Sequence, residues 1–186
     1  MGSQPVQIAL WRRLILRAFR VEVYFADIKT LLSGKPVIVI CNHQSLLDGL
    51  ILAFACPIKM VFPVTPKHSI ENPFTRRGLR LLERLSLGWV LPLNSEHPFA
   101  LRRLQQALEE GQSVAIFPEG RIAVPSEQLP QKAGAQWLQE RTGAPIVRAR
   151  LFGADKSRIF ARAGTQIWPK ITLQIGIGAL HDEFSH

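Results

Sequence analysis

Short runs typical of β-strands alternate with helical patterns along the chain, and this alternation restricts the fold more than any other feature. The predicted strands are residues 21–26, 37–41, 59–64, 88–93, 113–117, 146–152 and 171–177. The predicted helices between them are residues 46–55, 72–85, 97–110 and 131–141. This order predicts an α/β fold whose sheet is covered by helices on both faces. Proteins of this class bind ligands at the carboxyl ends of their strands, so functional residues are expected there.

The composition excludes several classes of protein. A hydrophobic fraction of 47% in 186 residues excludes an intrinsically disordered chain and predicts about one domain. Two cysteines, Cys41 and Cys56, exclude a disulfide scaffold, and their apolar neighbours indicate buried reduced thiols. The longest apolar stretch, residues 50–56, is much shorter than the roughly 20 residues of a membrane-spanning helix. With a formal net charge of +9, the chain is expected to bind either nucleic acid or a membrane surface.

Residues 1–20 are expected to form an amphipathic, membrane-associating helix ahead of a domain of residues 21–186. Apolar side chains cover most of this helix, and four arginines occupy the remaining sector: Arg12, Arg13, Arg17 and Arg20. Trp11 is suited to headgroup depth, where guanidinium groups meet lipid phosphates. The alternative is a helix packed on the core with its arginines in water. In the first arrangement the expected partner is an anionic membrane surface.

A first chemical motif, Asn-His-Gln-Ser-Leu-Leu-Asp, follows the predicted strand of residues 37–41 directly. Its His43 is the side chain best able to give and take a proton near neutral pH. Asp48 lies five positions on, so His43 must sit in the turn before the helix if the Asp48 carboxylate is to point back at its ring. The alternative is structural, because Ser45 and Asp48 also have the spacing of a capping box with Ser45 as N-cap.

A second motif, Phe-Pro-Glu-Gly-Arg, follows the predicted strand of residues 113–117 and occupies residues 117–121. Arg121 is suited to clamp a phosphate, because its planar guanidinium gives paired hydrogen bonds. Glu119 would accept hydrogen bonds from a glycerol-like hydroxyl or orient Arg121. The alternative is an ordinary turn in which both charges are solvated.

The two motifs, in this order and some 70 residues apart, resemble the glycerolipid acyltransferase family, whose hallmarks are Asn-His-x-x-x-x-Asp and Phe-Pro-Glu-Gly. The likeness extends from about residue 21 to residue 177. It implies a glycerophosphate acyltransferase-like fold, with a mixed, largely parallel sheet flanked by helices and preceded by the N-terminal amphipathic helix. Residues 132–135 and 169–173 are similar to the acyltransferase domain of bacterial 2-acylglycerophosphoethanolamine acyltransferases.

The resemblance implies that His43 is the general base and that Asp48 orients it. The residues that it assigns to substrate binding are Asn42, Ser45, Phe117, Pro118, Glu119, Gly120 and Arg121. The family commonly carries a further phosphate-binding arginine at the end of the strand that is here residues 88–93. This chain has Pro92 and Leu93 there. Arg102, Arg103 or Lys67 would be the substitutes, and phosphate binding rests mainly on Arg121.

The implied reaction moves a fatty acyl group from acyl-ACP or acyl-CoA to a lysophospholipid hydroxyl, without a metal or other cofactor. The favoured acceptor is lysophosphatidylethanolamine, and the alternative is 1-acylglycerol-3-phosphate, which gives phosphatidic acid. An acyl carrier protein is a further expected partner. The expected location is the cytoplasmic face of the inner membrane, as a peripheral protein.

Two other functions compete with acyl transfer. A thioesterase or lipase would be expected to carry a Gly-x-Ser-x-Gly nucleophile elbow, which the sequence lacks. A non-catalytic basic module would use the cationic face of residues 72–85, which carries Arg76, Arg77, Arg80 and Arg84. The chain has neither zinc-ligand spacing nor an RNA-binding aromatic signature, so nucleic acid is not an expected partner.

Overall fold

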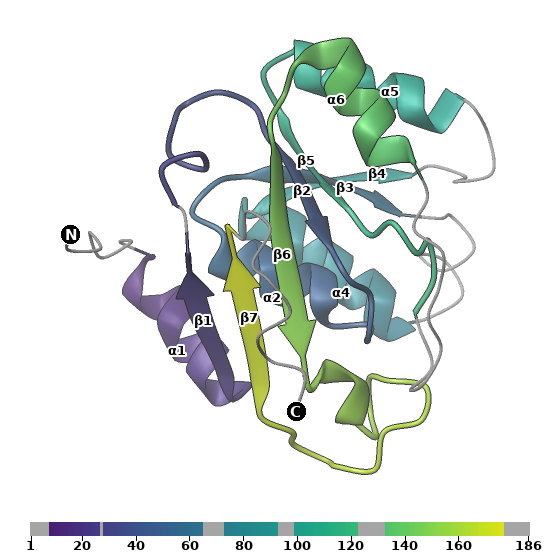
Figure 1. Cartoon of the computed structure of the whole chain (residues 1–186). Helices are drawn as coiled ribbons and strands as arrows, with labels where there is room; N and C mark the ends of the chain where they lie inside the picture. Colours follow the sequence, from purple (N-terminus) through teal and green to yellow (C-terminus); the bar gives the residue numbers. More distant parts are fainter. Residues whose placement is uncertain (1–7, 27, 65–72, 93–98, 123–132, 177–186) are drawn as a thin grey trace.

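The computed structural model describes residues 8–26, 28–64, 73–92, 99–122 and 133–176, which form an α/β fold around one mixed sheet (Figure 1). The described part contains seven paired strands, in the order β1-β7-β6-β2-β5-β3-β4. Their bounds are β1 Val21–Phe25, β2 Ile38–Cys41, β3 Met60–Val64, β4 Gly88–Pro92, β5 Ser113–Ile116, β6 Ile146–Phe152 and β7 Ile171–Ile175. All neighbouring strands are parallel except β6 and β7. The predicted mixed, largely parallel sheet is therefore confirmed.

Helices lie on both sides of this sheet. Their bounds are α1 Leu10–Ala18, α2 Asp48–Ala55, α4 Pro73–Arg84, α5 Phe99–Glu109, α6 Gly134–Thr142 and the short 3-10 helix η1 Ala154–Lys156. One core cluster joins α1, α2 and α4 to one face of the sheet, and a second joins α5 and α6 to the other (Figure 1). Leu52 is central to the first cluster, and Leu138 to the second; both are fully buried.

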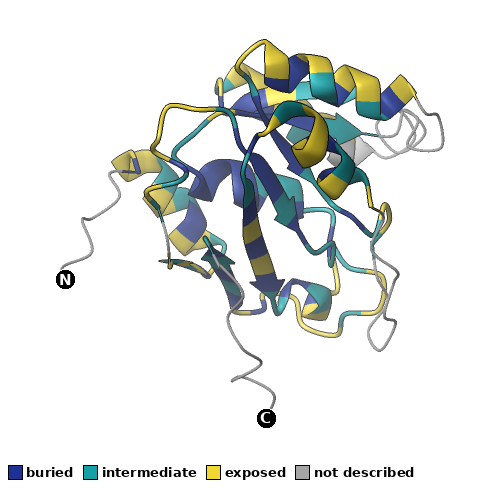
Figure 2. Ribbon diagram, turned by 45° about the horizontal axis from the view of Figure 1, so that its top comes forward, coloured by how far each residue is buried: buried dark blue, intermediate teal, exposed yellow. Residues whose placement is uncertain are grey.

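Helices lie on both faces, as predicted, but the coverage of the second face is only partial. The central strand β2 is apolar along its length because it is buried between the two helical layers. In β6, buried Val147, Ala149 and Leu151 alternate with exposed Arg148 and Arg150 (Figure 2). Alternation of this kind is typical of a strand with one solvated face. Helices α5 and α6 thus protect the sheet over β2, β5 and β3 but leave β6 open.

The strand directions decide which segments meet at the functional edge. Strands β1 and β7 run opposite to the other five, so they begin at the edge where β2, β5 and β6 end (Figure 1). The chain turns there at Gly153, whose φ of +82° favours glycine. A Cβ at this position would lie 2.4 Å from the main-chain oxygen of Lys170, so only glycine fits. The segments before β1 and before β7 therefore share an edge with the residues that follow β2 and β5.

Helix α1 is docked on the core by an arginine. The Arg12 Nε donates a hydrogen bond to the main-chain oxygen of Phe54 (2.9 Å), and its Nη2 donates to those of Ala53 (2.5 Å) and Cys56. These carbonyls end helix α2, where a cation is favoured by the helix dipole. Arg12 therefore caps α2, a role that differs from both alternatives drawn from the sequence, contact with lipid and exposure to water. No described helix is long and apolar enough to cross a membrane.

Both cysteines are free and buried, as the sequence predicts. Cys41 ends β2, and Cys56 follows α2. Burial raises the pKa of the Cys56 thiol to about 12 and also raises the pKa of Cys41. A thiol with a raised pKa carries little thiolate near neutral pH, so both groups act as small apolar side chains.

Candidate active site

His43 lies in the turn between β2 and α2, and Asp48 is the first residue of α2. The His43 Nδ1 is 3.0 Å from the Asp48 Oδ2, which is the geometry that their spacing predicts. The His43 side chain is 23% exposed, whereas the Asp48 side chain is fully buried. If Nδ1 donates to the carboxylate, the neutral ring carries its lone pair on Nε2. The pair therefore provides a base that acts through Nε2, because Nδ1 is already hydrogen-bonded to Asp48.

The Asp48 carboxylate is held by further donors from its own turn. The main-chain N–H groups of Gln44 and Ser45 donate to Oδ2, and the Ser45 hydroxyl donates to Oδ1 over 2.6 Å. Ser45 is 1% exposed, so it supports Asp48 rather than making the substrate contact predicted for it. Ser45 is also not the N-cap, because the helix begins at Asp48 and the residue before it is Leu47. These bonds fix the direction in which Asp48 faces His43.

Asn42 is also occupied by the protein itself. Its Nδ2 donates to the main-chain oxygen of Leu151 (2.9 Å), and its Oδ1 accepts from the main-chain nitrogen of Leu151 (2.7 Å). The side chain thereby ties the end of β2 to β6. This arrangement differs from the predicted substrate contact, because both polar atoms of the amide already have main-chain partners.

Glu119 likewise has a different partner from the one expected. Its Oε2 accepts a hydrogen bond from the main-chain N–H of His43 over 3.0 Å. The turn of residues 117–120 directs it there: the Gly120 N–H donates to the Phe117 oxygen, and Gly120 has a φ of +71°. Burial raises the pKa of the Glu119 carboxyl, although the bond from His43 opposes this shift. The second motif therefore positions the first, whereas the sequence predicted contacts with a hydroxyl or with Arg121.

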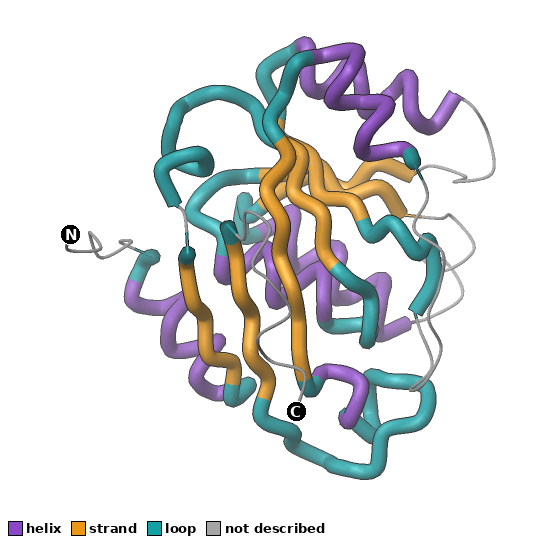
Figure 3. The backbone as a smooth tube through the Cα atoms, viewed as in Figure 1, coloured by secondary structure: helices purple, strands orange, loops and turns teal. Residues whose placement is uncertain are grey.

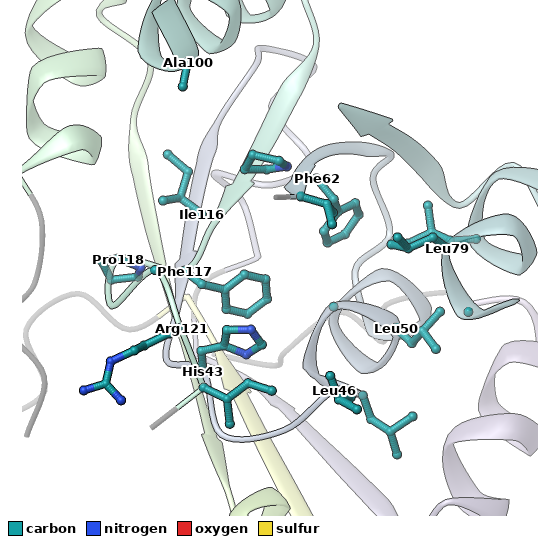
Figure 4. Close-up of a pocket in the computed structure, with 18 of the residues that line it drawn as sticks. His43, Leu46, Leu50, Phe62, Leu79, Ala100, Ile116, Phe117, Pro118 and Arg121 are labelled. Atoms are coloured by element: carbon teal, nitrogen blue, oxygen red, sulfur yellow. The ribbon is translucent and has the colours of Figure 1, made fainter. Parts of the chain in front are cut away.

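Aromatic packing fixes the exposed side of the imidazole. The rings of His43 and Phe117 are stacked, with centroids 4.5 Å apart and an interplanar angle of 30° (Figure 4). Phe117 and the buried Pro118 both line the cavity described next, as predicted substrate-binding residues would. Stacking restrains rotation of the ring, so that the bond to Asp48 and the stacking surface together define its orientation.

A cavity of about 350 Å³ opens beside His43, and its walls are mainly apolar. We call it the central cavity; its lining includes His43, Leu50, Phe62, Leu79, Leu104 and Arg121. These apolar walls come from α2, β3, α4 and α5, on both sides of the sheet edge. In Figure 4 the His43 ring lies between Arg121 on one side and Leu50 and Leu79 on the other. An elongated apolar group with a polar end matches this distribution of side chains.

Two lining residues were missed from the sequence. Phe160 and Arg162 reach the central cavity from the segment between β6 and β7. The Leu46 N–H donates to the Phe160 oxygen over 2.9 Å, which joins this segment to the turn that carries His43. The segment has neither helical nor strand periodicity, so no local signal points to the site. Among the described residues, no group of three His, Cys, Asp or Glu side chains is placed to hold a metal ion.

The arrangement can deprotonate a hydroxyl near one end of an apolar cavity. Gly120, Arg121 and Arg162 line the same cavity as His43, and both arginines are exposed. Two guanidinium groups at a cavity with mainly apolar walls favour a ligand with an anionic head and a hydrophobic tail.

The comparisons with known proteins agree with this chemistry. The sequence model of the family described as "Acyltransferase" matches residues 20–150. A chloroplastic 1-acyl-sn-glycerol-3-phosphate acyltransferase of Brassica napus is 27% identical over 161 residues, covering 79% of this chain and 42% of its own length. A 1-acyl-sn-glycerol-3-phosphate acyltransferase of Borreliella burgdorferi is 26% identical over 158 residues, covering 76% of this chain and 59% of its own. The chain thus spans about half the length of these curated relatives.

A solved structure shares the fold. The crystal structure of the 1-acyl-sn-glycerophosphate acyltransferase PlsC from Thermotoga maritima superimposes with a TM-score of 0.58. The match covers 94% of this chain and 73% of that structure, at 20% sequence identity. At this identity the likeness establishes the architecture of the sheet and its helices.

Proposed function

Because the chain belongs to the acyltransferase family, we propose that it transfers a fatty acyl group from an acyl thioester to the free hydroxyl of a lysophospholipid. The observation that carries the proposal is the position of the His43–Asp48 pair at the edge of the apolar central cavity. A base beside an apolar cavity suits a reaction between a hydroxyl and the carbonyl of a long acyl chain. Acyl transfer is the chemistry of the family. The lysophospholipid acceptor is the part that we propose beyond the family assignment.

In the proposed mechanism His43 is the catalytic residue. Its Nε2 takes the proton of the acceptor hydroxyl as the hydroxyl oxygen attacks the thioester carbonyl. The tetrahedral intermediate then expels the thiolate, which takes the proton back from Nε2, so that an ester and a thiol leave the site. Asp48 stabilises the imidazolium that forms between these steps. General acid–base help of this kind is worth about 10²- to 10⁴-fold in rate.

Three further residues position this base without touching the reacting atoms. Phe117 stacks on the ring, Glu119 holds the His43 main chain, and Asn42 ties the preceding strand to β6. Arg121 and Arg162 are the proposed contacts for the phosphate of the acceptor, because both line the cavity that contains His43. Since lipid substrates reside in bilayers, the proposed place of action is an anionic membrane surface, on its cytoplasmic side.

The favoured acceptor is now 1-acyl-sn-glycerol-3-phosphate, and phosphatidic acid is the expected product. The relatives, named as 1-acyl-sn-glycerol-3-phosphate acyltransferases, support this choice over lysophosphatidylethanolamine, which residues 132–135 and 169–173 favoured. A phosphate monoester also carries more negative charge than a phosphoethanolamine, so a pair of arginines discriminates in its favour. Lysophosphatidylethanolamine remains the second proposed acceptor.

A panel of acceptors and donors tests the proposal. The purified protein is given each lysophospholipid with either acyl-ACP or acyl-CoA, and the products are identified by mass. We expect diacyl product with 1-acyl-sn-glycerol-3-phosphate, at a higher kcat/KM than with lysophosphatidylethanolamine. Acceptor-independent release of free fatty acid would instead indicate a thioesterase. Absence of acyl transfer to every lysophospholipid by folded protein would overturn the proposal.

A further inference from the structure

The segment between β6 and β7, residues 153–170, exposes large apolar side chains at the edge of the sheet. We call it the β6–β7 loop. Ile159 is 50% exposed, Ile167 is 64% exposed and Trp168 is 43% exposed. Exposure of three such residues within ten positions is costly in water, and a cluster of this kind marks an interaction surface.

The exposed side chains stand on an ordered backbone. The Arg158 N–H donates to the Gln166 oxygen (2.7 Å), and the Gln166 N–H donates to the Lys156 oxygen (2.9 Å). The Ser157 hydroxyl accepts from the Phe160 N–H, and Ser157 is buried. These bonds close the loop on itself and hold Ile159 and Ile167 outward.

The loop is also joined to α1. The rings of Trp168 and Phe19 are stacked with centroids 5.5 Å apart, and the Trp168 Nε1 donates to the Ala18 oxygen over 2.9 Å. Exposed apolar residues recur at intervals of four along α1: Leu10, Leu14 and Ala18. The apolar stripe of α1 therefore continues into the β6–β7 loop.

The charge of the loop favours an anionic partner. It contains four basic residues, Lys156, Arg158, Arg162 and Lys170, and one acidic residue, Asp155. All four basic residues are exposed, and Lys170 pairs with Glu22. Apolar side chains interspersed with cations fit the interfacial region of an anionic bilayer, where the chains enter the acyl boundary and the cations meet phosphates.

The loop lies beside the central cavity. Phe160 and Arg162 line that cavity, although Ile159 next to them is exposed. In Figures 1 and 3 the loop follows the end of β6, at the edge where β2 also ends. His43 belongs to the turn that follows β2 at this edge. A membrane that covers the loop would therefore lie at the rim of the cavity.

We propose that the β6–β7 loop inserts Ile159, Ile167 and Trp168 into the interface of an anionic bilayer, next to α1. The loop and α1 then seat the protein in one orientation, with the rim of the central cavity at the lipid surface. The delivery of a lipid acceptor from that surface rests on the proposed function, but binding of the loop to lipid does not.

Vesicle flotation of the whole chain tests the proposal. The probes are vesicles of phosphatidylcholine with phosphatidylglycerol, and vesicles of phosphatidylcholine alone. The variant Ile159→Ser/Ile167→Ser should partition about tenfold more weakly into the anionic vesicles than the wild type, because two apolar side chains no longer enter the interface. The matched control is Leu32→Ser, since Leu32 is 57% exposed in the connection between β1 and β2, at the far end of the molecule. Its binding should equal that of the wild type.

Activity assays separate this proposal from the proposed function. With a short-chain lysophospholipid dispersed as monomers, the double variant should retain wild-type activity; with acceptor embedded in vesicles, it should lose most of it. Wild-type protein that floats through the loop yet transfers no acyl group would refute the proposed function only. A folded double variant that binds anionic vesicles as well as the wild type would overturn the present inference. If that double variant had also lost a self-association that the wild type shows, the partner of the loop would be a second copy of the chain.

Quenching of tryptophan emission tests insertion independently, in protein that keeps Ile159 and Ile167. Brominated lipids quench indoles that lie at acyl depth. Trp168→Phe should lose part of the quenchable emission of the wild type, whereas Trp89→Phe, on the edge strand β4, should lose none. Equal quenching in the wild type and in Trp168→Phe would contradict insertion of the loop.

Discussion

The carboxylate of Glu119 accepts a hydrogen bond from the main-chain N–H of His43, which lies 76 positions earlier in the chain. This bond joins the two sequence motifs of the family at one point. The turn that carries the base is therefore supported from both sides, by Asp48 within its own segment and by Glu119 from the end of β5.

Glu119→Ala should lower kcat by roughly 10- to 100-fold, because the His43 turn loses a support and the imidazole is misplaced. Glu119→Gln should remain close to the wild type, since the amide oxygen can still accept the His43 N–H. Steady-state kinetics at varied acceptor concentration distinguish a residue that positions His43 from one that contacts the acceptor. If Glu119→Gln instead raised the acceptor KM strongly at unchanged kcat, Glu119 would be a substrate contact.

Burial raises the pKa of Glu119 above its value in the unfolded chain, so its ionisation opposes folding. Its contribution to stability is present at low pH and is lost as the pH rises through the folded pKa. Glu119→Gln should therefore have a thermal midpoint equal to or above that of the wild type at neutral pH. The difference should shrink as the pH falls toward about 4. If the difference in thermal midpoint grew at low pH instead, the ionised Glu119 carboxylate would stabilise the fold, contrary to this expectation.

Asn42→Asp should lower stability and kcat together while the KM of the acceptor stays near that of the wild type. The carboxylate can accept the Leu151 N–H but cannot donate to the Leu151 oxygen, so one main-chain acceptor loses its partner. A loss of about 1–3 kcal/mol is expected from such a change. Urea unfolding and acceptor-dependent kinetics measure the two effects. A raised KM with unchanged stability would restore the substrate contact predicted from the sequence.

Arg12→Ala should lower the free energy of unfolding by about 2 kcal/mol, because three carbonyls at the end of α2 lose a charged donor. The matched control is Arg17→Ala on the same helix, at an exposed position, with an expected change within about 0.5 kcal/mol. Denaturant unfolding of both variants checks the difference. Equal effects of the two substitutions would show that Arg12 does not cap α2.

Gly49→Leu should shift donor preference toward shorter acyl chains. Gly49 lines the central cavity from α2, and a Cβ there would meet only Phe62, at 3.9 Å. The smaller Gly49→Ala should fold with equal or greater stability, because alanine favours a helix by up to about 1 kcal/mol over glycine. Competition between acyl thioesters of different length measures the preference. An unchanged length profile in folded Gly49→Leu would mean that the acyl chain does not pass this residue.

Local patterns predicted the elements well, since each strand is a short apolar run between turn residues. Strand β6 has the predicted bounds, and α2 begins two residues later than predicted because the Asp48 carboxylate binds N–H groups of the preceding turn. The antiparallel pairing of β6 with β7 was not predictable, because strand order depends on contacts between distant segments. The β6–β7 loop has no periodic pattern from which its structure could be predicted. The predictions for residues 1–7, 67, 72, 93, 97–98, 131–132 and 177 lie outside the described residues.

Within the site, the pairing of His43 with Asp48 was predictable because both residues belong to one turn. The partners of Asn42 and Glu119 were not, since each is a main-chain group brought near by the sheet: Leu151 on β6 and His43 after β2. Sequence motifs identify residue types, but only the fold shows which of their polar atoms are already bonded. The catalytic and substrate-binding roles themselves stay predictions.

The central claim is that His43 is the general base, and the rate of acyl transfer by His43→Ala tests it most directly. The variant is compared with the wild type and with His181→Ala, a histidine outside both sequence motifs, after circular dichroism has shown that all three are folded. We predict that His43→Ala loses at least about 10²-fold in kcat, and that His181→Ala retains wild-type activity. Full acyl transfer by folded His43→Ala would contradict the account.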